Sequence, residues 1–173
     1  MIHVEAQVEG DWDASGDWRP LAERAVVTAL RASTYGEWIG APLTVEISVR
    51  FTGDDEVQAL NARYRGKDAP TNVLSFPMVQ PDLLEGLTNS DDGEALLGDI
   101  ILAHGVCARE AAARGLSIAT HASHLIVHGI FHLLGYDHVG DAEAEAMEAL
   151  ERAALAAIGI ADPYAEDRDQ HGV

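Results

Sequence analysis

Alternating apolar and polar residues predict four strands in this chain. Residues 43–51 give the clearest pattern, and residues 2–8 alternate in the same way. Residues 73–76 form a short, largely apolar run. Residues 95–102 are apolar at nearly every position, which is typical of a strand covered on both faces of a sheet. On the predicted strand 43–51, the apolar face consists of Leu43, Val45, Ile47, Val49 and Phe51.

Apolar residues spaced three or four positions apart predict about five helices. Asp17, Ser117 and Asp141 precede three of these helices, and such side chains can accept a hydrogen bond from the first helical turn. The predicted helices are residues 18–35, 55–64, 104–114, 118–134 and 142–158. In the last helix, the residues expected to face inward are Met147, Leu150, Ala154 and Ile158.

The order of these elements indicates the α+β class, because strands come mainly first and helices last. We expect a small mixed sheet of about four strands packed with about five helices. The 173 residues fit a single domain, and no linker divides them. This domain is expected to span residues 1–160 and to be followed by an acidic, loosely held tail, residues 161–173. Residues 78–93 lack a regular pattern and are expected to form an acidic loop.

Several features favour a protein of the reducing cytoplasm that makes no membrane contact. The N-terminus lacks a basic segment followed by an apolar stretch, so it does not resemble a secretory signal. The most apolar long window, residues 118–136, contains four histidines, which a bilayer span does not tolerate. Cys107 is the single cysteine, which excludes an intramolecular disulfide, and we expect it to be a small packed residue.

The charge distribution leaves one place for contact with phosphate. A net charge of −18 argues against nucleic acid, because phosphate binding requires a cationic surface. However, three of the 11 Lys and Arg residues are the closely spaced Arg63, Arg65 and Lys67, which we call the cationic cluster. These three residues are therefore candidates for binding a phosphate backbone.

Three histidines have the spacing of a metal site. His128 and His132 are four residues apart on a predicted helix, so their Cβ atoms lie about 6 Å apart on one face. Two imidazoles in this arrangement can bind one ion at about 2.0–2.1 Å. Gly135 can adopt the left-handed conformation that ends a helix, which would let the chain turn back and bring His138 to the same ion. We therefore expect a metal site at the C-terminal end of this central helix.

Zinc is the expected cofactor, with one ion per chain, although nickel or another divalent transition metal also suits imidazole ligands. Three protein ligands leave a fourth position open, as in catalytic zinc sites. The offsets of His128, His132, Gly135 and His138 match the metzincin peptidase pattern HExxHxxGxxH. Gly129 stands where those peptidases have their glutamate base. Glycine cannot take up a proton, which weighs against peptide hydrolysis.

Other residues are candidates for supporting the metal ligands. His124 lies one turn before His128 on the same helix face and could donate a hydrogen bond, carry a proton or act as a further ligand. Asp137 could accept a hydrogen bond from a ligand histidine, or it could cap the helix end. His121 lies further back on the helix and is expected to be partly exposed.

Three segments together resemble the YbeY family of bacterial endoribonucleases, the rRNA maturation factors. They are HGIFHLLGYDH at residues 128–138, YRGKDAPTNVLSFP at residues 64–77 and LLGDIIL at residues 96–102. They occur in the order that the family has, and the resemblance covers most of residues 43–158. It implies a metal-dependent hydrolase that cuts single-stranded RNA during 3′-end maturation of 16S rRNA and in ribosome quality control. The implied partners are small-subunit rRNA, the small ribosomal subunit and its proteins.

The resemblance also implies residue roles. The metal ligands of the family fall on His128, His132 and His138, and its functional arginine falls on Arg65. Arg65 and His128 are thus the expected catalytic residues. A guanidinium can bind a phosphate and stabilise the charge that develops on it during cleavage. Ser75 and Asp99 are expected on the walls of the cleft, either in chemistry or in fixing the local geometry.

Three functions remain as hypotheses at this point. The first is the zinc-dependent endoribonuclease that the resemblance implies. The second is a zinc-dependent peptidase-like hydrolase, suggested by the histidine spacing. The third is a non-enzymatic ribosome-assembly factor with a structural metal.

Overall fold

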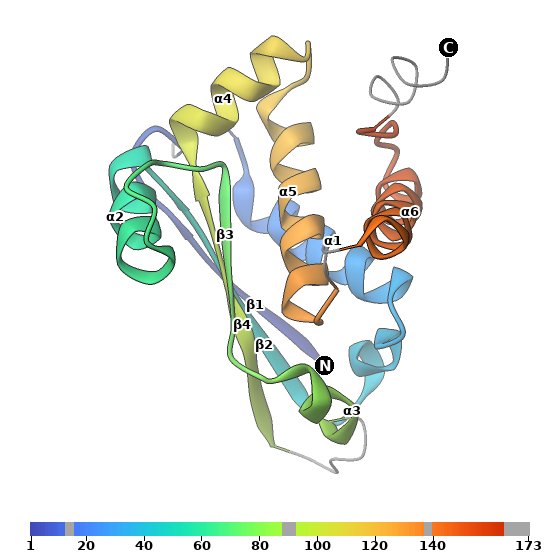
Figure 1. Cartoon of the computed structure of the whole chain (residues 1–173). Coiled ribbons are helices and arrows are strands. Elements are labelled where there is room, and N and C mark those ends of the chain that lie inside the picture. The colour runs from blue at the N-terminus through green and yellow to red at the C-terminus, as the bar shows by residue number, and fades with distance from the viewer. Residues whose placement is uncertain (13–15, 88–92, 137–139, 165–173) are drawn as a thin grey trace.

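The computed structural model describes residues 1–12, 16–87, 93–136 and 140–164 (Figure 1). Within these ranges, helices and strands occur in the order β1 (Ile2–Val8), α1 (Trp18–Ala32), β2 (Thr44–Thr52), α2 (Asp54–Arg65), β3 (Val73–Pro77), α3 (Leu84–Leu87), β4 (Glu94–Ala103), α4 (His104–Ala113), α5 (Ile118–Leu133) and α6 (Asp141–Ala157). Short 3-10 turns lie at Gly10–Trp12, Gly36–Gly40 and Pro81–Leu83. The predicted α+β class and five long helices are confirmed for the described residues.

The described strands form one mixed sheet in the order β1-β2-β4-β3. β1 and β4 both run parallel to β2, whereas β3 pairs with β4 in the antiparallel direction. The predicted alternation in β2 is confirmed, because Val45, Ile47, Val49 and Phe51 are all fully buried. β3 lies at one edge of the sheet, so one side of its backbone is free to take part in a site.

Helices cover both faces of the sheet (Figure 1). α1 and α5 pack together on one face, and α6 packs against both of them from outside. α2 lies on the other face, where Val57 packs against Leu74 and Ile101 in a small second core. Ile100 and Ile101 are adjacent in β4 but belong to the two different cores, as expected for a strand covered on both faces.

Some local expectations differ from the structure. The segment predicted as a loop at residues 78–93 contains the short helix α3, whose Leu84 is fully buried in the main core. Asp17 precedes α1 but makes no capping hydrogen bond with its side chain. Asp141 is the first residue of α6 rather than its cap, where its negative charge still favours the helix N-terminus. Ser117 does cap α5, because its Oγ accepts a hydrogen bond from the Thr120 N–H.

Gly98 allows β3, β4 and the end of α5 to approach one another closely. The pairing of β4 with β2 shifts at this point, because Leu96 pairs with Glu46 whereas Gly98 pairs with Ile47. A Cβ atom on Gly98 would lie 2.5 Å from the Phe76 carbonyl oxygen and 2.7 Å from Leu133 Cδ2. Any larger residue would therefore push β3 away from the helix that carries the histidines.

Replacing Gly98 with alanine is expected to lower the free energy of unfolding of the metal-free protein by about 2–3 kcal/mol, because the added methyl group overpacks this crossing. Urea unfolding followed by circular dichroism measures the change. Gly40→Ala is the matched control, since a Cβ atom there meets nothing within 4 Å. We expect it to change stability by about 0.5 kcal/mol or less. Equal effects of the two substitutions would contradict the close approach at Gly98.

None of the helices in the described ranges combines the length and apolar character needed to cross a membrane. Cys107 is fully buried in the main core, as predicted. Burial raises the pKa of its thiol to about 12, with smaller contributions from Glu110 and Asp54. A thiol that stays protonated at neutral pH is a poor nucleophile, so Cys107 has a packing role.

Candidate metal centre and cleft

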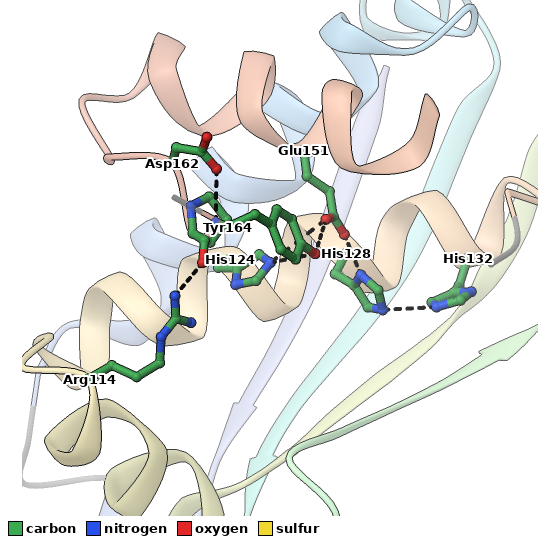
Figure 2. Close-up of polar contacts among 8 residues, drawn as sticks. Arg114, His124, His128, His132, Glu151, Asp162 and Tyr164 are labelled. Atoms are coloured by element: carbon green, nitrogen blue, oxygen red, sulfur yellow. Dashed lines mark hydrogen bonds and ion pairs between the residues drawn. The ribbon is translucent and has the colours of Figure 1, made fainter. Parts of the chain in front are cut away.

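The histidines of α5 share one face of a mostly buried helix. His124, His128 and His132 follow one another along this face (Figure 2). The opposite side of the helix is anchored in the core by fully buried residues such as Ile126 and Ile130. The helix therefore has a fixed rotation, which holds the three imidazoles on the side that faces β3 and the C-terminal segment.

His128 and His132 converge on one point. Their Nε2 atoms are 2.9 Å apart, and the two rings are nearly perpendicular, at 81°. Two nitrogens bound to one tetrahedral zinc ion lie about 3.4 Å apart when each bond is about 2.1 Å long. The two Nε2 atoms could thus bind one metal ion if they moved apart by about half an ångström.

Glu151 of α6 sets the tautomer of His128. Its side chain is fully buried, and one carboxylate oxygen, Oε1, accepts a hydrogen bond from His128 Nδ1. Burial alone would raise the pKa of Glu151, but contacts with His124, His128 and Tyr164 outweigh burial and lower it to about 2. The ionised carboxylate can only accept, so His128 carries its proton on Nδ1. Its Nε2 lone pair is left for a metal, which is the usual arrangement of carboxylate–histidine–metal sites.

Tyr164 completes this buried network. Its hydroxyl donates to Glu151 Oε2 and lies 3.5 Å from His124 Nε2 (Figure 2). Burial, followed by the neighbouring Glu151 carboxylate, raises the pKa of Tyr164, so that the hydroxyl stays protonated and acts as a donor. The predicted supporting role of His124 stays a prediction, but the helix does bring His124 to 3.8 Å from Glu151 Oε2.

Asp137 and His138 lie outside the described residues. α5 ends at Leu133, and Gly135 has a positive φ of 92°, as expected where the chain turns back. Within the described ranges, no group of three His, Cys, Asp or Glu residues could hold a metal ion. The third ligand thus stays a prediction from the sequence, whereas the first two converge as that prediction requires.

The histidine pair opens into a cleft of about 320 Å³. β3 forms one wall of the cleft and α5 the other. The residues that line it are Arg65, Asn72, Val73, Ser75, His124, Leu125, His128, Gly129, His132 and Tyr164. A larger hollow of about 730 Å³ between α1 and α6 is lined by no histidine or cysteine, and Glu23 is the one carboxylate in its lining.

Arg65 reaches the cleft from the last turn of α2. The helix ends at Gly66, whose positive φ of 70° turns the chain away. One guanidinium nitrogen, Nη2, donates to the Ser75 carbonyl oxygen at 2.9 Å, and the guanidinium carbon lies 5.7 Å from the centre of the Phe76 ring. These contacts fix the guanidinium at the rim. The hydrogen bond to Ser75 uses one of the five N–H donors of the guanidinium, so the other donors can bind a ligand.

The other two members of the cationic cluster lie outside this cleft. Arg63 is exposed and rests over the Tyr64 ring at 5.2 Å. Lys67 is exposed and lines an adjoining hollow of about 300 Å³ that also includes Arg65. Of the cluster, only Arg65 lies beside the histidines, and the other two extend the positive charge outward from it.

Half of the outward backbone groups of residues 73, 75 and 77 in β3 are missing or already hydrogen-bonded within the chain. Asn72 and Met78 form backbone hydrogen bonds with β4. In an antiparallel pair this alternates along the strand, so the backbone N–H and C=O groups of the odd-numbered residues between them point away from β4. The Val73 N–H is taken by the Asn72 side chain at 2.7 Å, and Arg65 takes the Ser75 carbonyl. Pro77 has no N–H. An extended peptide would therefore find fewer backbone partners along this wall than along an unmodified strand edge.

Gly129 lies where α5 packs closely against β4. A Cβ atom there would lie 3.1–3.3 Å from three carbon atoms of the Ile100 side chain. The glutamate that zinc peptidases have at this position would require the Ile100 side chain to shift by a few tenths of an ångström.

Three outcomes correct or extend the sequence-based picture. His121, expected to be partly exposed, is buried, and its Nε2 lies 2.8 Å from Glu110 Oε1. Asp99 does not line the cleft, whereas Ser75 does. Glu151 and Tyr164 were not predicted. The available signal for Glu151 was its place on the inward side of the last helix, four residues after Met147 and three before Ala154.

Comparisons with known proteins identify relatives of this chain and a solved structure with a similar fold. The family model described as Endoribonuclease YbeY matches residues 14–159. A relative from Rhizorhabdus wittichii, named Endoribonuclease YbeY, is 62% identical over 98% of this chain and 100% of its own length. A relative of the same name from Sphingopyxis alaskensis is 55% identical over 96% of this chain and 99% of its own length. The solution structure of TM1509 from Thermotoga maritima has a similar fold, with a TM-score of 0.53 at 22% identity, covering 90% of this chain and 91% of that one.

Proposed function

Because the chain belongs to the Endoribonuclease YbeY family, we propose that it is a metal-dependent endoribonuclease that cuts single-stranded RNA in the β3–α5 cleft. The observation that carries this proposal is the presence of two converging imidazoles and a fixed guanidinium in one cleft. His128 and His132 supply metal-binding nitrogens, and Arg65 supplies a group that recognises phosphate. Only a fifth of the His128 side chain is exposed (20%), so a flexible strand reaches it more easily than a rigid duplex does.

One zinc ion per chain would be held by His128, His132 and His138, with nickel or another divalent transition metal as the alternative. When bound, zinc supplies a Lewis acid that polarises a phosphate oxygen and makes water more acidic. The two converging Nε2 atoms, and the Glu151 carboxylate that fixes the His128 tautomer, support this ligand set. Asp137 would accept a hydrogen bond from another ligand histidine.

Other side chains would bind the RNA, stabilise developing charge and support the metal ligands. Arg65 would bind the scissile phosphate and stabilise its developing charge, because its position is fixed before the substrate arrives. Arg63 and Lys67 would bind flanking phosphates outside the cleft. His124 lies between Tyr164 and the metal ligands and would carry hydrogen bonds among them.

Two features of the cleft oppose the peptidase alternative. The contacts already made along the edge of β3 leave fewer backbone groups for binding an extended polypeptide by strand addition. Glycine at position 129 cannot act as the general base that zinc peptidases have there, and a larger residue would crowd the Ile100 side chain. The open cleft beside the histidines also disfavours a purely structural metal, which is normally enclosed by four protein ligands.

The cellular role that we propose is maturation of the 3′ end of 16S rRNA and ribosome quality control in the cytoplasm. The partners would be small-subunit rRNA, the small ribosomal subunit and its proteins. A net charge of −18 repels RNA at long range. Delivery by a basic ribosomal protein would overcome this repulsion, and the cationic cluster would then act at close range.

The test of this function uses the zinc-loaded protein and a His132→Ala variant. Both are incubated with labelled single-stranded RNA, duplex RNA and an unfolded polypeptide. We expect the wild type to cut single-stranded RNA internally, to cut duplex RNA at least tenfold more slowly and to leave polypeptide intact. Equal RNA cleavage by the variant would reveal a contaminating nuclease and reject the proposal. Cleavage of polypeptide alone would identify a peptidase.

A further inference from the structure

The chain after α6 turns back toward the metal centre. Residues Asp162–Tyr164 form a short segment that returns beside α5 (Figure 2). Asp162 Oδ1 accepts a hydrogen bond from the Tyr164 N–H at 2.8 Å. Arg114, just after α4, donates to the carbonyl oxygen of Pro163, which is itself buried. One contact within the segment and one from the end of α4 therefore fix the backbone that carries Tyr164.

Tyr164 meets Glu151 on the side opposite His128. One carboxylate oxygen of Glu151 accepts from His128 Nδ1, and the other accepts from the Tyr164 hydroxyl. The Tyr164 ring also packs edge-on against the His124 ring, with centroids 5.6 Å apart. If the fully buried Glu151 carboxylate loses one of these donors, one oxygen is left without a hydrogen bond. This costs free energy away from water and favours reorientation of the carboxylate toward another donor.

His124 is the competing donor. Its Nε2 lies 3.8 Å from the same Glu151 oxygen that Tyr164 binds, beyond ordinary hydrogen-bond distance. If the Tyr164 hydroxyl is removed, a small rotation of Glu151 brings that oxygen to His124. The same rotation weakens the bond from His128 Nδ1. We therefore expect Tyr164 to favour pairing of the Glu151 carboxylate with His128 over pairing with His124.

We propose that Asp162–Tyr164 is a clasp, anchored by Arg114, in which Tyr164 is a positioning residue that holds Glu151 against His128 and so presents His128 Nε2 to the metal. This inference rests on the proposed metal site but does not depend on RNA cleavage. The clasp lies beyond residues 14–159, where the family model matches. It couples metal affinity to Arg114, a residue that touches neither a histidine ligand nor Glu151 in the contacts described above.

The first measurement uses the metal-free protein, so it is independent of activity. Nitrogen-15 NMR of the imidazoles, at a pH above the ordinary histidine pKa of about 6.5, reports which ring nitrogen of His128 is protonated. We expect the Nδ1–H tautomer in the wild type and a mixture of tautomers in Tyr164→Phe. Tyr35→Phe is the matched control, because its ring stacks on Trp38 outside the clasp. It should keep the wild-type tautomer.

The second measurement is the zinc dissociation constant, determined by competition with a chelator. Tyr164→Phe should weaken zinc binding by about tenfold, the lower end of the effect expected when a partner of a ligand histidine is lost. Arg114→Gln should weaken it by a smaller factor. Arg109→Gln is its control, since Arg109 lies in α4, close to Arg114 in sequence, but pairs with Asp54 at 3.3 Å. Circular dichroism of each metal-free variant verifies that it is folded.

The clasp is rejected if folded Tyr164→Phe keeps both the wild-type tautomer and a zinc dissociation constant within twofold of the wild type. It is also rejected if the Tyr35 and Arg109 controls weaken zinc binding as much as the clasp variants do. A wild type that binds zinc tightly but cuts no RNA would instead reject the proposed function. The tautomer result would still decide the clasp in that case.

Discussion

Replacing His128 with alanine is expected to abolish metal binding and RNA cleavage together, and to destabilise the metal-free protein. The first effect follows from loss of one of three expected ligands. The second follows from Glu151, whose fully buried carboxylate loses the donor on Oε1. Removing one partner of such a buried pair costs about 2–4 kcal/mol. Metal content measured by mass spectrometry and urea unfolding of the metal-free variant check the two parts separately.

His132→Ala separates the metal ligand from the buried pair. This change removes a Nε2 atom that faces the metal position but leaves the contact between His128 and Glu151 in place. We expect loss of metal and cleavage with a much smaller loss of stability. If both alanine variants lose the same stability without metal, the buried carboxylate does not depend on His128 as described here.

Replacing Arg65 with alanine is expected to lower kcat for RNA cleavage by about 10²–10³-fold, the effect of removing one preorganised donor from a developing charge. Metal content should be unchanged, because Arg65 contacts β3 rather than the histidines. Arg65→Lys should recover little of the lost activity. The planar guanidinium can donate to the Ser75 carbonyl and to a phosphate at the same time, whereas a lysine ammonium group lacks this planar set of donors. Single-turnover cleavage of a short labelled RNA measures the chemical step.

The matched control for Arg65 is Arg24→Ala on α1, which lines the distant hollow between α1 and α6. Its kcat should equal that of the wild type. Loss of bound metal in Arg65→Ala would contradict its role as a phosphate-binding group and assign it to the metal centre. A kcat within threefold of the wild type would show that Arg65 only shapes the cleft.

Much of the fold could be predicted because its patterns are local. The alternation in residues 43–51 predicts a half-buried strand, and β2 has that face fully buried. The apolar run at residues 95–102 predicts a strand with two covered faces, and β4 contributes to both cores. α3 was missed, because a four-residue helix in an acidic segment has too few positions to set a period.

The site was predictable where ligands lie close together in sequence. His128 and His132 are one helical turn apart, so helix geometry alone brings their rings together. Glu151 lies 23 residues beyond His128, and a glutamate on an inward helix face gives no indication of its partner. Asp137 was the nearer carboxylate and hence the one that sequence reasoning selected. Its position falls outside the described residues, so its own role stays a prediction.

The sequence by itself determined the α+β class, the helix that carries the histidines and the shared face on which His124, His128 and His132 lie. These follow from periodicities of about two and 3.6 residues, which are properties of the backbone. Only the tertiary structure decided what surrounds those histidines. Packing of α6 against α5 places Glu151 beside His128, and the end of α2 places Arg65 beside β3. The segment that returns after α6 places Tyr164 beside Glu151. Such contacts join distant parts of the chain, and they depend on how whole elements pack rather than on any local spacing.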